Sequence, residues 1–322
     1  MITIAGAGLA GLATALELAR RGVSVRVFEA GPEIGAGSVA RYAGGMLAPW
    51  CESESAEDDV ITLGASAAGW WAGITPVSRS GTLVVAPARD RAELARFARR
   101  CSGFRTVAED DIAALEPALK GRFAQGLFFE REAHLDPRRA LRDLARAAEA
   151  LGVEIILGTR APGQVDLDCT GMQARLPDLR PVRGEMAILH CPEITIRRTI
   201  RLLHPRMPLY LVPRAEGHFM IGATMIESAS ERPPSLRSLS ELLGAAYAIH
   251  PGFAEASVIE TGSGLRPAFP DNLPRLVTQA GVLHLNGFYR HGFLLAPAMA
   301  GRAVQHILSE TRHAHHSECQ SA

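Results

Sequence analysis

The first thirty residues restrict the fold of this chain more than any other segment, because they place a glycine-rich turn between a strand and a helix. Ile2 and Ile4 alternate as in a strand, and the segment Gly6-Ala-Gly8-Leu-Ala-Gly11 follows. A helical pattern comes next, and a second alternating segment over 23–29 ends on an acid. This order predicts a βαβ unit that carries the G-x-G-x-x-G pattern.

Each glycine of the turn has its own predicted role. Gly6 permits a tight turn, Gly8 lets the backbone approach a pyrophosphate, and Gly11 allows helix and strand to pack closely. The helix N-terminus offers N–H groups and a partial positive charge to phosphates. Glu29 can accept hydrogen bonds from a ribose hydroxyl, which favours FAD or NAD over NADP. The predicted dinucleotide contacts are therefore Gly6, Gly8, Leu9, Ala10, Gly11 and Glu29.

Composition disfavours several classes of partner and enzyme. The length of 322 residues predicts about two domains, and the net charge of zero gives no electrostatic case for nucleic acid or an acidic membrane. No apolar run approaches the ~20 residues of a membrane helix, and the strand at the chain start predicts that no targeting peptide is present. The five cysteines form no C-x-x-C pair, so we expect reduced thiols, no metal site and a cytoplasmic location.

The lysine content disfavours two further enzyme classes. Lys120 is the only lysine, so the chain has no Gly-Lys-Ser/Thr phosphate loop. A pyridoxal Schiff base would have to form on Lys120 in a loop-like Leu-Lys-Gly context, which is a poor setting for it.

Periodicity places the remaining elements along the chain. A glycine-rich loop follows the second strand, and the acidic residues over 51–59 are expected to be exposed. The tail over 313–322 is low in hydrophobicity and is expected to be disordered. Helices are predicted over 60–72, 90–101, 109–115, 136–151, 235–249 and 292–308, and strands over 81–87, 126–130, 153–157, 165–168, 184–190, 209–213, 218–224, 258–262 and 282–286.

Five motifs, in order along the chain, match those of a known family. They are GAGLAGLATALELARRG with Glu29, Gly-Gly-Met-Leu over 44–47, Tyr-Leu-Val-Pro-Arg over 210–214, Gly-Leu-Arg-Pro over 264–267 and Gly-Phe-Tyr-Arg-His-Gly over 287–292. On these motifs the chain resembles the D-amino-acid-oxidase-type flavoproteins, and among them the glycine oxidases that serve thiamine biosynthesis.

The resemblance implies an α/β (α+β) fold with two domains. A Rossmann-type FAD-binding domain would comprise 1–75, 133–182 and 261–312. A discontinuous, mainly antiparallel β-sheet substrate domain would comprise 76–132 and 183–260.

The resemblance also implies roles for single residues. Arg266 would hold the substrate carboxylate through bidentate contacts, and Tyr210 would donate its hydroxyl to the same group. Arg290 would border substrate and flavin, and the helix that Gly292 opens would stabilise negative charge on the reduced ring. Met46 would contact both substrate and flavin. The other implied FAD contacts are Arg41, Gly44, Gly45, Thr170, Gly171, His291 and Phe293.

Without the resemblance, these residues have simpler interpretations. Arg266 has the pattern of a surface arginine, and Tyr210 that of an aromatic residue in a strand. Arg290 is different, because it stands between a buried strand and a buried helix, where an unpaired charge is costly.

Two segments depart from the family pattern. The loop after Glu29 carries Val39 and Ala40 where a threonine–serine pair is common, so Arg41 is a candidate phosphate contact. The segment 157–169 is short, so we expect a thin outer layer on the FAD-binding domain.

The resemblance implies an FAD-dependent amine oxidase. A hydride would pass from the Cα of glycine, or of a small amino acid, to flavin N5, giving an imine and, with oxygen, hydrogen peroxide. The implied partners are the amino acid, oxygen, further copies of the chain in a homo-oligomer, and thiazole synthase as the receiver of the imine. The alternatives are an FAD oxidase or dehydrogenase of sarcosine, proline or D-amino acids, a nicotinamide-dependent dehydrogenase, and a flavin-binding protein without turnover.

Overall fold

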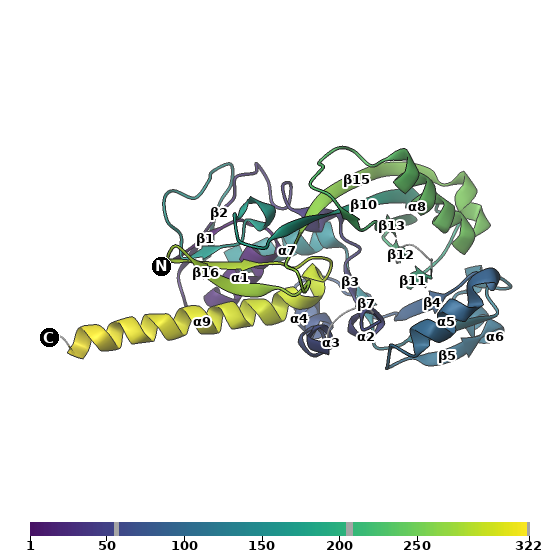
Figure 1. Ribbon diagram of the computed structural model, residues 1–322, viewed down its shortest axis with the longest axis horizontal. Helices are drawn as coiled ribbons and strands as arrows, with labels where there is room; N and C mark the ends of the chain where they lie inside the picture. The colour runs from purple at the N-terminus through teal and green to yellow at the C-terminus, as the bar shows by residue number, and fades with distance from the viewer. Residues whose placement is uncertain (55–57, 204–208, 321–322) are drawn as a thin grey trace. The chain divides into compact units, whose positions relative to one another are not determined.

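The computed structural model describes residues 1–54, 58–203 and 209–320, without the side chains of residues 58 and 311–320. The chain forms two compact units, drawn as ribbons in Figure 1. The first unit comprises Met1–Arg41, Arg138–Arg180 and Pro267–Ala322, and the second comprises Tyr42–Pro137 and Pro181–Arg266.

The first unit is built on a six-stranded sheet in the order β16-β17-β9-β1-β2-β8. These strands are β1 (Ile2–Ala5), β2 (Val25–Phe28), β8 (Glu154–Ile156), β9 (Leu167–Asp168), β16 (Arg275–Gln279) and β17 (Val282–Asn286). β1 runs parallel to β2 and to β9, and α1 (Leu9–Ala19) connects β1 to β2. The predicted βαβ unit is therefore confirmed, and its glycine turn lies at the C-terminal edge of a central strand.

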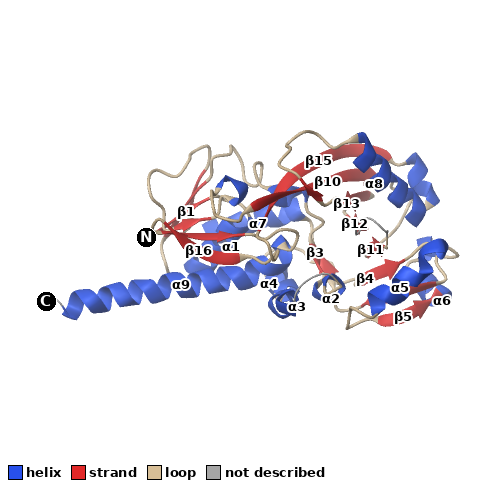
Figure 2. Cartoon of the chain, in the orientation of Figure 1, coloured by secondary structure: helices blue, strands red, loops and turns tan. Residues whose placement is uncertain are grey.

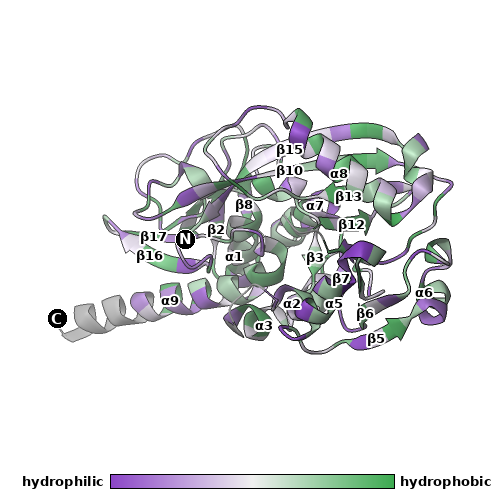
Figure 3. Ribbon diagram, turned by 45° about the vertical axis from the view of Figure 1, so that its right-hand side comes forward, coloured by the Kyte–Doolittle hydropathy of each residue, from purple (hydrophilic) through white to green (hydrophobic). Residues whose placement is uncertain are grey.

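Helix α1 is buried along most of its length and packs against α9 (Gly292–Gln320). Its sequence is mostly apolar, as the green ribbon of Figure 3 shows, and its alanines and glycine bring the two helices close. A third long helix, α7 (Pro137–Glu149), begins at the predicted proline.

Helix α9 continues to Gln320, which differs from the expected disordered tail over 313–322. No glycine or proline follows Gly301, so the sequence contains no strong signal that would end the helix. The polar composition of the tail alone does not end it. One turn before the tail, His306 and Glu310 lie 3.4 Å apart as an i,i+4 pair. Residues 321–322 lie outside the described residues. Among the residues that are described, no helix combines the length and apolarity that crossing a bilayer requires.

The second unit is built on a nine-stranded, mainly antiparallel sheet, whose strands are red in Figure 2. Its order is β14-β10-β13-β12-β11-β4-β6-β5, and β15 also pairs with β10. The strands are β4 (Thr82–Val85), β5 (Arg105–Ala108), β6 (Gln125–Phe129), β10 (Arg180–His190), β11 (Thr199–Leu202), β12 (Leu209–Pro213), β13 (His218–Gly222), β14 (Ile226–Glu227) and β15 (Ser257–Ala268). A separate two-stranded ribbon joins β3 (Met46–Leu47) to β7 (Ala133–His134).

Within its described residues, the second unit has six α-helices. They are α2 (Pro49–Glu52), α3 (Asp58–Gly64), α4 (Ala67–Ala72), α5 (Arg91–Ala98), α6 (Glu109–Leu115) and α8 (Leu236–Ile249). Successive residues of a strand point to opposite faces of the sheet. One face packs with α6 and α8 into an apolar core that includes Leu83, Ile112, Ile200, Leu211, Ile221 and Leu242. The opposite face carries the charged side chains described below.

The two units divide the chain differently from the predicted domains. Residues 42–75, 133–137, 181–182 and 261–266, which were expected in the FAD-binding domain, belong to the second unit. The physical reason is packing and pairing: Cys51 is buried in one apolar cluster with Val84 of β4, and β15 is one continuous strand. The assignment of cofactor and substrate to separate domains stays a prediction.

Candidate active site

The glycine turn of the first unit fits a bound pyrophosphate. Gly6 has φ +95°, and a Cβ added to it would lie 2.8 Å from the carbonyl oxygen of Cys169. A Cβ on Gly11 would lie 1.9 Å from the carbonyl oxygen of Gly6. These two glycines are therefore required by the packing of the chain itself. A Cβ on Gly8 would meet only the Ser38 side chain, at 3.4 Å from Oγ, so Gly8 leaves space beside the start of α1 that the chain does not use.

The polar groups around this space suit a dinucleotide. The first turn of α1 contains no acidic residue that would compete for its N–H groups. Glu29 accepts hydrogen bonds from the backbone N–H of Ala7, at 2.9 Å, and of Gly31, at 2.8 Å. These contacts fix the Glu29 carboxylate beside the turn, where the sequence predicted a ribose contact. Leu9 and Ala10 are buried, so their contribution would come from the backbone.

Two further loops lie at the same C-terminal edge of the sheet. After β9, Thr170 donates to Asp168 Oδ1 from its backbone N–H and from its hydroxyl. Gly171 has φ +61°, and its carbonyl oxygen accepts a hydrogen bond from Asn286 Nδ2 at 2.8 Å. Asn286 ends β17, so it ties the loops after two neighbouring parallel strands together. The sequence analysis did not single out Asn286, although a buried strand that ends on an amide at this edge is a detectable signal.

The N-terminus of α9 lies beside the N-terminus of α1. A Cβ added to Gly292, the first residue of α9, would lie 3.0 Å from Leu9 Cδ2. His291 and Phe293 are buried on either side of it, and Arg290 Nε lies 3.4 Å from His291 Nε2. The positive ends of two helix dipoles thus meet in one place, which favours an anionic group there.

Arg41 lies in the first unit, in the short 3-10 turn over 39–42. Its Nη1 atom donates to the carbonyl oxygen of Ala36 at 3.3 Å, and its own carbonyl oxygen accepts a hydrogen bond from Arg138 Nε at 3.3 Å. These contacts hold the loop that follows Glu29. They do not test the predicted phosphate contact of Arg41, which stays a prediction.

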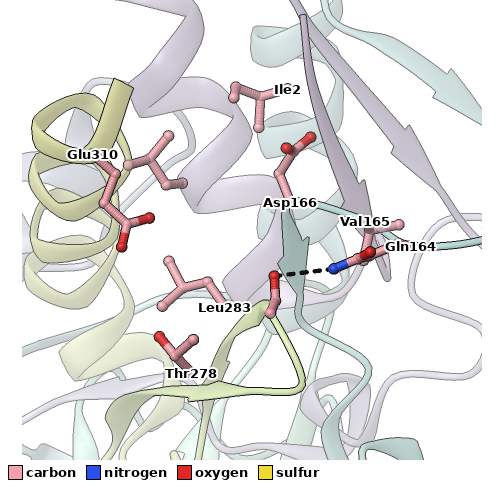
Figure 4. Close-up of a pocket in the computed structure, with 9 residues that line it drawn as sticks. Ile2, Gln164, Val165, Asp166, Thr278, Leu283 and Glu310 are labelled. Carbon is pink, nitrogen blue, oxygen red and sulfur yellow. Dashed lines mark hydrogen bonds between the residues drawn. The ribbon is translucent and has the colours of Figure 1, made fainter. Parts of the chain in front are cut away.

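A cavity of about 390 Å³ in the first unit lies at the other end of the sheet. Ile2, Asp166 and Leu283 line it, and they stand at the starts of their strands, as Figure 4 shows. Asp166 accepts hydrogen bonds from the backbone and hydroxyl of Thr3, which join two strands. Parallel sheets bind ligands at the carboxyl ends of their strands, so this cavity is not the dinucleotide site.

In the second unit, residues that pair across neighbouring strands form a row on one face of the sheet. This face is opposite to the one that packs into the large apolar core. The row consists of Leu127, Val84, Arg201, Tyr210, Gly222 and Met186 on six neighbouring strands. Arg266 lies near one end of this face, where its guanidinium covers Gly184: a Cβ on Gly184 would lie 2.2 Å from Arg266 Nη2. Arg266 Nη1 donates to the carbonyl oxygen of Thr224 at 2.9 Å. Gly184 therefore lets a half-buried guanidinium lie flat on the sheet.

Tyr210 and Met46 belong to the same face. They lie in or against a small apolar cluster with Met186, Val212 and Met220. The glycines before Met46 serve packing within the second unit, because a Cβ on Gly45 would lie 2.3 Å from the carbonyl oxygen of Leu135 and one on Gly44 would touch Val212. The predicted flavin contacts of Gly44, Gly45 and Met46 stay predictions.

The Tyr210 hydroxyl has a protein partner in this structure, and its predicted contact with a substrate carboxylate stays a prediction. The hydroxyl donates to Glu52 Oε1, at the end of α2, and both side chains are only 5% exposed. The expectation that 51–59 is exposed is wrong for Cys51 and Glu52, and residues 55–57 lie outside the described residues. The error arose because five acids and two serines in 52–59 indicate a surface segment, whereas α2 packs Cys51 into an apolar cluster.

Among the residues that the structure describes, four charged or ionisable groups lie around the Glu52–Tyr210 pair. Arg201 is 2% exposed, lies 5.1 Å from the Tyr210 ring centroid, and donates to Glu54 at 3.1 Å and to the Cys51 carbonyl oxygen at 2.9 Å. Burial raises the pKa of the Cys51 thiol, although Arg201 opposes this. Glu132 accepts a hydrogen bond from the Cys51 N–H at 2.6 Å. Burial raises the pKa of Glu132 to about 8, although that hydrogen bond favours the charged form.

Glu132→Gln should remove a pH dependence of stability. The unfolded carboxyl loses its proton near its ordinary pKa of 4.5, whereas the folded one keeps it up to about 8. Between these values the folded state binds more protons, so the stabilisation is complete below the lower pKa and is lost as pH rises through the upper one. The total contribution of this protonation to the free energy of unfolding is on the order of a few kcal/mol. Thermal unfolding of wild type and Glu132→Gln between pH 4.5 and about 8 checks the effect. Parallel plots of Tm against pH for the two proteins would contradict it.

The chain matches known proteins over almost its whole length. The profile of the family "FAD dependent oxidoreductase" (DAO) matches residues 1–306. A Rhizobium etli protein, provisionally named thiamine biosynthesis oxidoreductase ThiO, is 54% identical over 96% of this chain and 97% of its own. A glycine oxidase of Pseudomonas aeruginosa is 27% identical over 92% of each chain. The crystal structure of glycine oxidase from Bacillus cereus has a TM-score of 0.80 at 20% identity, covering 96% of this chain and 95% of that one.

These matches agree with the fold and with the turn around Gly8. Among the described residues, no group of three or more His, Cys, Asp or Glu side chains is arranged to hold a metal ion. The four cysteines whose side chains are described, Cys51, Cys101, Cys169 and Cys191, are free thiols. The chain belongs to the DAO family of FAD-dependent oxidoreductases, and FAD is its cofactor.

Proposed function

We propose that this chain is an FAD-dependent amine oxidase that acts on glycine or another small amino acid. The observation that carries the proposal is the Arg266 guanidinium, which lies flat over Gly184 and is held at Nη1 by the Thr224 carbonyl oxygen. A fixed, half-buried guanidinium is suited to a bidentate contact with a carboxylate. Tyr210 and Met46 line the same sheet face and would complete the substrate-binding surface.

The protein residues bind and orient, because the redox chemistry belongs to the cofactor. Bound FAD supplies a hydride acceptor at its N5 atom. Arg266 would fix the carboxylate and so direct the Cα–H of the amino acid. The turn at Gly8 and Glu29 would hold the pyrophosphate and ribose of the cofactor. The start of α9 at Gly292, with Arg290, would stabilise negative charge on the reduced ring.

The product of this reaction is an imine, and oxygen is the proposed electron acceptor, with hydrogen peroxide released. The name of the Rhizobium etli relative supports a role in thiamine biosynthesis. We therefore propose that the imine of glycine passes to thiazole synthase, the enzyme that builds the thiazole part of thiamine. A homo-oligomer stays a further prediction of the family resemblance.

The test is an aerobic peroxide assay on the purified yellow protein with glycine, sarcosine, D-alanine and D-proline. Peroxide from glycine, formed at least as fast as from the other three, is the expected result. Faster peroxide from sarcosine or a D-amino acid would keep the oxidase class and change the substrate. No peroxide, with anaerobic bleaching of the flavin by one of the four, would indicate a dehydrogenase. No reaction in either assay would overturn the substrate class.

A further inference from the structure

Gly222 lies on the same sheet face as Arg266 and Tyr210, and a side chain of the protein covers it. Gly222 of β13 pairs with Tyr210 of β12 and with Met186 of β10. A Cβ added to Gly222 would lie 2.5 Å from Met220 Cε and 3.4 Å from Met220 Sδ. The thioether end of Met220 therefore lies over Gly222, in space that a side chain at position 222 would otherwise occupy.

Gly222 also lies between the two residues that are proposed to bind the substrate. In the sheet, β13 stands between β10 and β12. Arg266 covers Gly184 of β10, and Tyr210 belongs to β12. Adjacent strands are about 4.8 Å apart, and diagonal neighbours on one face are about 7–8 Å apart. An amino acid that contacts both Arg266 and Tyr210 therefore extends across β13, next to Gly222.

Met220 is placed to restrict what fits over Gly222. It is 2% exposed, and it pairs with Val212 on β12 and with Ile188 on β10. Methionine is unbranched, has three rotatable bonds and fills irregular apolar gaps. In an amino acid held at its carboxylate, Cα is the next atom. A substituent on Cα would therefore compete with the Met220 methyl group for the same space.

We propose that Met220 is a specificity-determining residue, whose methyl group restricts the substituent on the substrate Cα and so favours glycine over alanine. The inference rests on the proposed function, since it needs an amino acid held by Arg266. One methyl group more or less in an apolar site changes kcat/KM about 10- to 200-fold. Removal of the Met220 methyl group should therefore shift the preference toward alanine by a measurable amount.

The experiment compares kcat/KM for alanine and for glycine in wild type and in Met220→Leu. Leucine has a similar volume, but its side chain ends at Cδ, so the Cε methyl group over Gly222 is lost. We expect the ratio of kcat/KM for alanine to that for glycine to rise about 10-fold or more. Both enantiomers of alanine are assayed, and the faster one is used in every variant.

Gly222→Ala, added to Met220→Leu, tests whether the effect is due to this space. The new Cβ would fill the position that Met220 Cε approaches in wild type, so the ratio should return toward the wild-type value. Ile188→Val is the matched control, because it removes one methyl group from a residue that pairs with Met220 and not with Gly222. It should keep the wild-type ratio.

A binding measurement follows the same change without turnover. Propionate has the shape of glycine and isobutyrate that of alanine, with a methyl group in place of the amine, and isobutyrate has no enantiomers. The change in flavin absorbance on binding measures both dissociation constants. In Met220→Leu the affinity for isobutyrate relative to that for propionate should rise about 10-fold.

Unchanged ratios in Met220→Leu, or an equal rise in Ile188→Val, would overturn the inference and leave the proposed function intact. Flavin absorbance and thermal unfolding show whether each variant is loaded and folded. If Met220→Leu folds poorly, Gly222→Ala alone carries the test: its Cβ should lower the relative affinity for isobutyrate about 10-fold, and an unchanged ratio would overturn the inference. A wild type that oxidises no amino acid would overturn the proposed function and, with it, this inference.

Discussion

Gly8→Val is expected to fold and to purify without flavin. A Cβ at position 8 meets only the Ser38 side chain, at 3.4 Å from Oγ and 3.9 Å from Cβ, so the packing of the chain itself does not require a glycine there. The valine would instead occupy the space beside the first N–H groups of α1, where the pyrophosphate has to approach. Loss of FAD would remove all oxidase activity. Visible absorbance of the purified protein measures flavin content, and thermal unfolding with added FAD shows whether the fold remains.

Gly11→Ala is the matched control for Gly8→Val. Its added Cβ would lie 1.9 Å from the Gly6 carbonyl oxygen, so the helix would have to move away from the strand. We expect this smaller substitution to destabilise the fold by several kcal/mol, whereas Gly8→Val affects mainly the cofactor. A yellow, fully loaded Gly8→Val protein would contradict the assignment of the turn to the pyrophosphate.

Much of the fold could be predicted because local signals and tertiary packing agree. The turn from Gly6 to Gly11, the helix that opens at Pro137 and the strand Leu209–Pro213 all lie where the sequence placed them. In each case a strong local signal coincides with burial of the same residues. The strands β5, β11 and β16 were not predicted. They are four or five residues long, and short segments carry a weak local pattern. β11 depends on the distant strand β4 and β5 on β6, whereas β16 pairs with the next strand, β17, across the two-residue turn Ala280-Gly281.

The substrate side of the site was harder to predict than the cofactor side. Arg266 and Tyr210 came from a family resemblance, and their neighbours Gly184, Arg201 and Glu52 were not found. Gly184 and Arg201 lie within ordinary alternating strands, where a glycine or an arginine has no special local pattern. Glu52 is the last residue of a short helix and precedes an acidic stretch, so its burial depends on how α2 packs against the sheet. Only register across several strands brings these residues onto one face.

Arg266→Ala is expected to leave the protein yellow and to raise the Michaelis constant for the amino acid by orders of magnitude. Each hydrogen bond between a charged donor and its partner contributes about 1.5–3 kcal/mol. Two such bonds to a carboxylate amount to about 3–6 kcal/mol, which corresponds to a loss of about 100- to 10,000-fold in kcat/KM. Steady-state kinetics with the amino acid found in the peroxide assay measures the loss, and flavin content should match that of wild type.

Arg266→Lys separates geometry from charge at the same position. Lysine keeps the positive charge and has no planar fork, so it cannot lie flat over Gly184 or hold a carboxylate by two parallel bonds. We therefore expect this variant to recover only a small part of the kcat/KM that alanine loses. If lysine restored full activity, the contribution of Arg266 would be charge alone, and the bare Gly184 would have no role in binding. If alanine left the kinetics unchanged, Arg266 would not hold the carboxylate, and the proposed substrate site would be wrong.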